Sequence, residues 1–144
     1  MRNIKSTKVF ISAQRATNTP EQNAVSDAEL GCDLTLIDGV ECFRSIVGGY
    51  SYRDCHGEQR QERENAYVCF LRPGGILEAI EALTELAASY GQDTLLVVHG
   101  DDAAEVIECG TTCSAIIGTF QPIPGEPDPG EDFSLVDSTY YVVR

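Results

Sequence analysis

The chain has 144 residues, with 23 Asp and Glu against 10 Lys and Arg, so its formal net charge is −13. A chain of this length forms one core, and we expect a single domain over residues 1–144. Such acidity argues against nucleic-acid and anionic-membrane partners, because both are bound through basic patches. Cationic small molecules, basic proteins and DNA-binding proteins remain as partners.

The sequence carries no pattern of a membrane protein or a secreted protein. No run approaches the roughly 20 apolar residues that span a bilayer. The stretch Met1 to Lys5 is charged and has no apolar segment behind it, which is not typical of a secretory leader. We therefore expect a cytoplasmic protein.

The first elements are a strand and a helix. Lys8 to Ser12 is a short apolar run suited to a buried strand. Thr19 and Gln22 form a capping box around Pro20, which is favoured at the first helical position, so a helix is predicted from Pro20 into the early thirties. The spacing places three small residues on one stripe of this helix: Ala24, Ala28 and Cys32.

A turn and two strands follow. Asp38-Gly39 predicts the turn, and Glu41 to Tyr52 reads as a strand interrupted by Gly48-Gly49. Adjacent glycines inside a strand indicate a bulge or the close approach of a ligand or another backbone. Asp54 to Glu64 is polar and predicts a mobile connection. Ala66 to Leu71 is the next strand.

The second helix is predicted over Gly75 to Tyr90, with Gly91 placed to end it. Apolar residues recur at the spacing of one buried face: Ile76, Ile80, Leu83, Ala87 and Tyr90. The opposite face is acidic and is expected to be solvated: Glu78, Glu81 and Glu85.

The remaining chain predicts more strands. They cover Thr94 to Val98, Ala104 to Glu108, Ser114 to Gln121 and Thr139 to Val143, and Pro122 to Pro129 is a surface loop. The order strand, helix, strand, strand, helix, strand predicts an α+β ferredoxin-like sandwich (βαββαβ) with a C-terminal strand extension. Its uncovered sheet face meets solvent, the C-terminal strands or another subunit.

Metal chemistry is not indicated. The six cysteines form no C-x-x-C pair, and only His56 and His99 are available as imidazole ligands. Cys69 is expected to pack as a small core residue. Standard hydrolase, zinc-protease and nucleotide-binding motifs are absent.

Polar groups gather after the first strand. Ser12 and Arg15 follow it, and Asn23 lies in the first turn of the next helix, a common place for recognising polar ligands. Tyr50 after the two glycines adds an aromatic ring, and Glu64 leads into a strand. Each also has an ordinary reading: Asn23 on a helix surface, Arg15 in a surface ion pair and Tyr50 in the core.

Several patterns stand in order along the chain: Val9-Phe10-Ile11-Ser12-Ala13-x-Arg15, Asn23, Gly49-Tyr50, Glu64 before a strand, Tyr90-Gly91-Gln92-Asp93-Thr94-Leu95-Leu96-Val97, and Gly118-Thr119-Phe120-Gln121 before the Pro-rich loop. Together, from about Lys8 to Val143, they resemble the phage-encoded S-adenosylmethionine-cleaving enzymes. The chain departs from that family between Tyr50 and Glu64 and around Gly100 to Thr112.

The resemblance implies a ferredoxin-like homotrimer, in the cytoplasm of an infected bacterium, with substrate held between subunits. It implies cleavage of S-adenosylmethionine (SAM) to 5′-methylthioadenosine and homoserine lactone, which depletes SAM and counters host restriction and methylation. The sulfonium is a good leaving group and the substrate's own carboxylate can attack its γ-carbon, so no metal or cofactor is expected.

The expected site has two catalytic residues. Glu64 faces the ammonium or sulfonium, and Tyr50 offers a ring face or a hydroxyl to the cation. Gly48 and Gly49 let backbone groups approach the adenine. The further substrate-binding candidates are Ser12, Arg15, Asn23 and Gln92, with Glu105 and Glu108 as candidates for a second carboxylate from a neighbouring subunit.

Three alternatives stay open at this point. A hydrolase would give homoserine in place of the lactone. The charge of −13 also suits a non-catalytic acidic protein that imitates DNA to block a restriction or methylation enzyme. A third reading is a sensor that binds SAM or a nucleotide without cleaving it.

Overall fold

The computed structural model describes residues 6–111 and 113–144, so the charged stretch Met1 to Lys5 lies outside the described residues. Within that part of the chain, no helix is both long and apolar enough to cross a membrane. The elements in chain order are β1 Lys8–Ile11, α1 Pro20–Leu34, β2 Val40–Arg53, β3 Gln59–Leu71, α2 Ile76–Ser89, β4 Thr94–Val98, β5 Ala103–Glu108, β6 Ser114–Ile123, β7 Phe133–Val136 and β8 Thr139–Val143.

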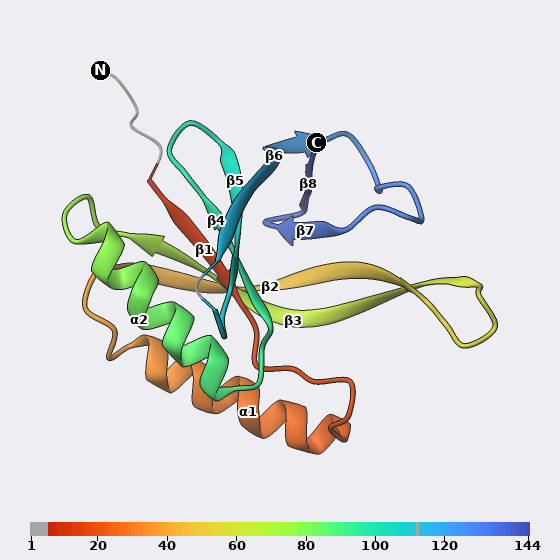
Figure 1. Cartoon of the computed structure of the whole chain (residues 1–144), viewed down its shortest axis with the longest axis horizontal. Coiled ribbons are helices and arrows are strands. Elements are labelled where there is room, and N and C mark those ends of the chain that lie inside the picture. Colours follow the sequence, from red (N-terminus) through yellow and green to blue (C-terminus); the bar gives the residue numbers. More distant parts are fainter. Residues whose placement is uncertain (1–5, 112) are drawn as a thin grey trace.

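The strands form a closed antiparallel barrel in the order β1-β3-β2-β7-β8-β6-β5-β4 (Figure 1). The prediction of a ferredoxin-like sandwich with appended strands is therefore wrong, although the order of the first six elements is as predicted. The reason is that the C-terminal strands occupy both edges of the sheet formed by the first four. β5 pairs with β4 along its whole length, and β7 pairs with β2 at Val47 to Gly49.

Alternation along the strands divides the apolar residues between two cores. On β1, Val9 packs toward the helices and Phe10 toward the barrel interior; on β3, Cys69 and Val68 divide in the same way. The helix-side core also takes Leu30, Leu83 and Ala87 from the two helices, and the prediction that Cys69 is a core residue is confirmed. Both faces of the central strands are thus covered within one chain.

Both helices begin and end close to the predicted residues. The capping box of Thr19 and Gln22 is present at the start of α1, and Gly91 follows α2 in the left-handed region at φ 75°. The α1 stripe of Ala24, Ala28 and Cys32 is exposed, and the buried residues of this helix are Leu30 and Leu34. On α2 the three glutamates are exposed, as expected.

Strands β2 and β3 form one long hairpin that extends beyond the barrel (Figure 1). The expected mobile connection over Asp54 to Glu64 is wrong beyond a short turn, since β3 already begins at Gln59. The Asp54 carboxylate organises this turn: its Oδ1 accepts from the backbone N–H of His56 and Glu58, each at 2.9 Å. The hairpin therefore brings residues before and after the turn into fixed cross-strand pairs.

The two glycines do not interrupt β2, which continues through them in register with β3. The close approach predicted at this point comes from a side chain of β7. A Cβ on Gly49 would lie 2.0 Å from Cε1 of Phe133, so the ring packs directly on the backbone. The guanidinium of Arg63 then lies 5.1 Å from the centre of the same ring. This contact closes the barrel between β2 and β7.

We predict that Gly49→Ala destabilises the fold by about 1–3 kcal/mol, the usual cost of forcing an atom into a packed site. Gly48→Ala is the matched control on the same strand, because its Cβ would come no nearer than 3.9 Å to any side chain. Urea unfolding measures both. Equal stability of the two variants would contradict the packing of Phe133 on Gly49.

Candidate active site

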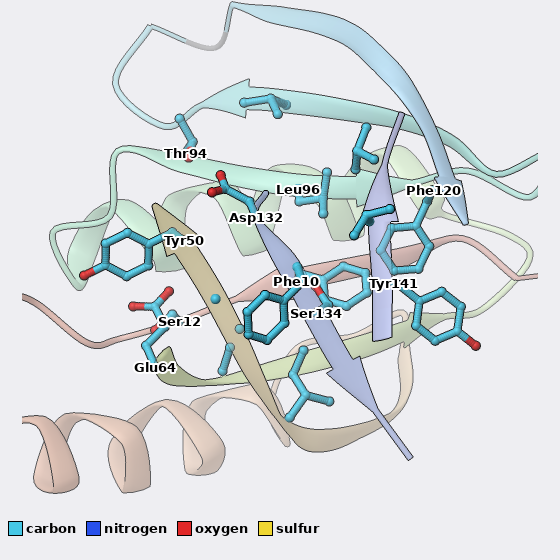
Figure 2. Close-up of a pocket in the computed structure, with 18 of the residues that line it drawn as sticks. Phe10, Ser12, Tyr50, Glu64, Thr94, Leu96, Phe120, Asp132, Ser134 and Tyr141 are labelled. Atoms are coloured by element: carbon cyan, nitrogen blue, oxygen red, sulfur yellow. The ribbon is translucent and has the colours of Figure 1, made fainter. Parts of the chain in front are cut away.

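A cavity of about 670 Å³ opens at one end of the barrel, a size typical of sites for small molecules (Figure 2). Aromatic residues line it in the barrel interior, where the rings of Phe120 and Tyr141 stack with their centres 4.9 Å apart and Phe10 lies 5.3 Å from Phe120. Figure 2 shows Ser12, Tyr50 and Glu64 together at the opposite end of the cavity, which we call its mouth. The cavity thus combines an aromatic interior with a polar mouth.

Glu64 is the half-buried carboxylate of the mouth. It lies on β3 opposite Gly48 of β2, and both residues line the cavity. No hydrogen bond or ion pair joins this carboxylate to any residue in the described part of the chain. Burial raises its pKa above the usual range, and the neighbouring charge of Glu62 raises it further. A half-buried carboxylate with no partner among the described residues is a strong acceptor for a cation.

Tyr50 lies beside Glu64, so the structure brings the two predicted catalytic residues together. The Tyr50 hydroxyl donates to Oε2 of Glu62 at 3.0 Å, and the Tyr52 hydroxyl donates to Oε1 of the same carboxylate at 2.9 Å. Burial and the bond to Glu62 raise the pKa of Tyr50 to about 12, so it stays protonated at neutral pH. Its ring forms one wall of the mouth.

Asp132 is a second carboxylate of the cavity, and the sequence analysis missed it. It precedes β7, a strand that was also missed because it has four residues and follows a Pro- and Gly-rich loop. Its Oδ1 accepts from the Ser51 backbone N–H at 2.9 Å and from the Ser51 hydroxyl at 3.2 Å. The apolar residues Phe133 and Leu135, with a polar residue between them, are the sequence pattern that could have predicted this strand.

Four of the predicted binding residues also line the cavity, namely Ser12, Gly48, Gly49 and Gln92. Two of them use their side chains to hold the framework. The Ser12 hydroxyl donates to the Asn65 carbonyl at 3.0 Å, and the Gln92 amide donates to the Gln14 carbonyl at 2.8 Å. Gly49 is covered by Phe133 on one side, as described above, whereas Gly48 has no such cover.

The other four predicted binding residues do not line this cavity. Arg15 packs against Gly91, and Asn23 accepts from the Arg15 backbone N–H at 3.0 Å, so the pair holds the loop before α1. Glu105 meets Nε2 of His99 at 2.9 Å, and Glu108 accepts from the Thr111 hydroxyl at 2.8 Å. Within one chain these residues have structural contacts.

The arrangement suits an amphipathic cation. An aromatic interior accommodates a flat apolar group, and a half-buried carboxylate with an adjacent ring attracts a positive charge. Among the described residues, no group of three or more His, Cys, Asp and Glu is arranged to hold a metal ion.

The model of the S-adenosylmethionine lyase family matches residues 9–144. No curated protein matches the chain.

We predict that Glu64→Gln raises the melting temperature at neutral pH, because it removes an ionised group from a site that burial makes unfavourable for charge. A raised folded-state pKa means that Glu64 favours folding below its unfolded pKa and that this contribution is lost as pH rises through the folded pKa. The gain in the variant should therefore be small near about pH 4 and largest near about pH 7.

Calorimetry at the two pH values measures the effect, with Glu81→Gln on the exposed face of α2 as the matched control. A variant at Glu64 that melts like the wild type at both pH values would show that this carboxylate is not desolvated.

Proposed function

The chain belongs to the S-adenosylmethionine lyase family, and on that premise we propose that it cleaves SAM to 5′-methylthioadenosine and homoserine lactone in the cavity at the barrel mouth. The proposed reaction uses no metal and no cofactor. The observation that carries it is the Glu64 carboxylate, half-buried at the cavity mouth and without a partner in the described part of the chain. SAM brings two cationic groups and a flat adenine to such a site.

The reaction balances without an external acid, base or water. An oxygen of the substrate carboxylate forms a bond to the γ-carbon, and the γ-carbon–sulfur bond breaks with its electron pair passing to sulfur. The sulfonium becomes the neutral thioether of methylthioadenosine, and the amino-acid part closes to a lactone that keeps its ammonium. No proton changes place during this step.

Charge considerations assign Glu64 to the ammonium rather than the sulfonium. The sulfonium charge disappears in the transition state, so an anion against it would stabilise the substrate more than the transition state and slow the reaction. The ammonium charge persists from substrate to product, and an ion pair there anchors the chain without opposing the chemistry. Glu64 therefore acts as an anchor, and Tyr50 supplies a ring face beside it.

The cavity itself supplies the rest of the catalysis. The attacking carboxylate and the sulfonium both lose charge on reaction, and such a step is favoured where water is excluded. Holding the substrate folded, with its carboxylate against the γ-carbon, contributes up to roughly 7–11 kcal/mol through proximity. The aromatic interior around Phe10 and Phe120 accommodates the adenine in this arrangement.

The biological role and the assembly are parts of the same proposal. Removal of SAM from an infected bacterium would starve its methyltransferases and SAM-dependent restriction enzymes. A homotrimer with substrate between subunits is supported by one edge of β6, where Ser114 to Ile116 and Gly118 pair with β5 and, among the described residues, with no second strand. Ile116 and Ile117 on that edge are 61% and 51% exposed, and Ile117 also lines the cavity.

Incubation of the purified protein with SAM, followed by separation of the products, tests this function. We expect methylthioadenosine and homoserine lactone in equal amounts, with homoserine appearing only as the lactone hydrolyses. Homoserine that forms before any lactone would identify a hydrolase, and unchanged SAM would overturn the proposal.

Glu64→Gln should lower kcat/KM by about 100-fold, because the amide keeps the shape but gives up the charge-assisted bond to the ammonium. For the wild type, kcat/KM should rise with pH through the raised pKa of Glu64, and this limb should vanish in the variant. Glu81→Gln is again the control. A wild-type rate in Glu64→Gln would remove this residue from the reaction.

A further inference from the structure

Asp132 is an exposed residue that lines the cavity, and one of its two carboxylate oxygens is held by the protein. Oδ1 accepts both bonds from Ser51, and Oδ2 has no partner among the described residues. The backbone beside it is fixed, because the next residue, Phe133, is paired with Gly49 of β2. Asp132 therefore presents a positioned acceptor to whatever occupies the cavity.

The position of Asp132 corresponds to the middle of the proposed substrate. Glu64 lies at the polar end with the ammonium, and the aromatic interior takes the adenine, which leaves the ribose between the two. Figure 2 shows Asp132 on the wall of the cavity between Tyr50 and Leu96, in that intermediate region.

We propose that Asp132 binds the 2′- and 3′-hydroxyls of the substrate ribose and makes the site selective for ribonucleosides over deoxyribonucleosides. This inference rests on the proposed function and extends it to sugar recognition. A carboxylate only accepts hydrogen bonds, and a vicinal diol offers two donors to it, so the pair forms charge-assisted bonds.

Other polar residues of the cavity are less suited to this role. Glu131 is adjacent to Asp132, but its two oxygens accept from Nε and Nη2 of Arg144, each at 2.9 Å. The hydroxyls of Thr94 and Ser134 also line the cavity, yet a hydroxyl can donate or accept and does not require a sugar hydroxyl opposite it. Asp132 therefore remains as the charged acceptor that distinguishes a ribose from a deoxyribose.

The test uses methylthioadenosine, the nucleoside product, because it carries the ribose but lacks the ammonium that Glu64 would bind. Calorimetric titration compares it with its 2′-deoxy and 3′-deoxy analogues. We expect the wild type to bind the ribonucleoside about 10- to 100-fold more tightly than at least one deoxy analogue, as is typical of bonds to a charged group. In Asp132→Ala the three nucleosides should bind within about 3-fold of one another.

Asp132→Asn is the conservative variant. The Ser51 N–H holds the amide oxygen on its own side, so the amide nitrogen faces the cavity and a donor replaces the acceptor. Asp132→Asn should therefore lose most of the preference for the ribonucleoside. The matched control is Asp137→Asn, on the turn after β7 where Asp137 pairs with Arg44, and it should keep that preference. Melting temperatures confirm that the variants are folded.

A wild type that binds all three nucleosides equally, or an Asp132→Ala variant that keeps the full preference, would overturn the assignment of Asp132. Both outcomes are read from binding and stay distinct from the cleavage assay. A protein that leaves SAM intact would instead overturn the proposed function.

Discussion

The pairing of β7 with β2 is the contact on which the rest of the molecule depends. It joins a short strand near the end of the chain to the middle of the β2–β3 hairpin, and the ring of Phe133 seals the junction against Gly49. Without it the eight strands would form an open sheet with β2 at one edge and β7 at the other. With it the sheet closes, and alternate residues of every strand point into an interior that ends in a cavity.

Closure also explains the chemistry of the mouth. The hairpin register places Glu64 opposite Gly48, and β7 brings Asp132 beside Ser51 of the same hairpin. Two carboxylates from distant parts of the chain thus face one cavity with different surroundings. Asp132 is anchored by two hydrogen bonds, whereas Glu64 has none in the described chain and is held where water is partly excluded. The first arrangement suits a sugar, and the second suits a cation.

Local features of the fold could be predicted from the sequence, because their signals are local. The capping box of Thr19 and Gln22 and the apolar spacing of Ile76 to Ala87 define helices without reference to the rest of the chain. Closure of the barrel could not be predicted in this way, since the pairing of β2 with β7 joins segments far apart in the sequence. The buried face of α1 could not be predicted for a similar reason: it is set by the position of Tyr67 and its neighbours on β3.

The same distinction applies to the candidate site. Glu64 and Tyr50 were suggested by the family resemblance, and the hairpin register brings them together. Arg15 and Asn23 were placed in the site because they follow a strand, but their hydrogen bonds serve the local loop. The alternating Phe133 and Leu135 beside Asp132 indicate a strand but no site, so this carboxylate is recognised only once β7 is paired with β2.

The central claim is that Glu64, which has no partner in the described part of the chain, binds the substrate ammonium. The most direct test is a ¹³C NMR titration of the Glu64 side chain, with and without a non-cleavable SAM analogue that keeps the ammonium. The free protein should show a pKa above the usual glutamate range, and the analogue should lower it, because a cation favours the charged form. A pKa in the ordinary range that the analogue leaves unchanged would contradict the account.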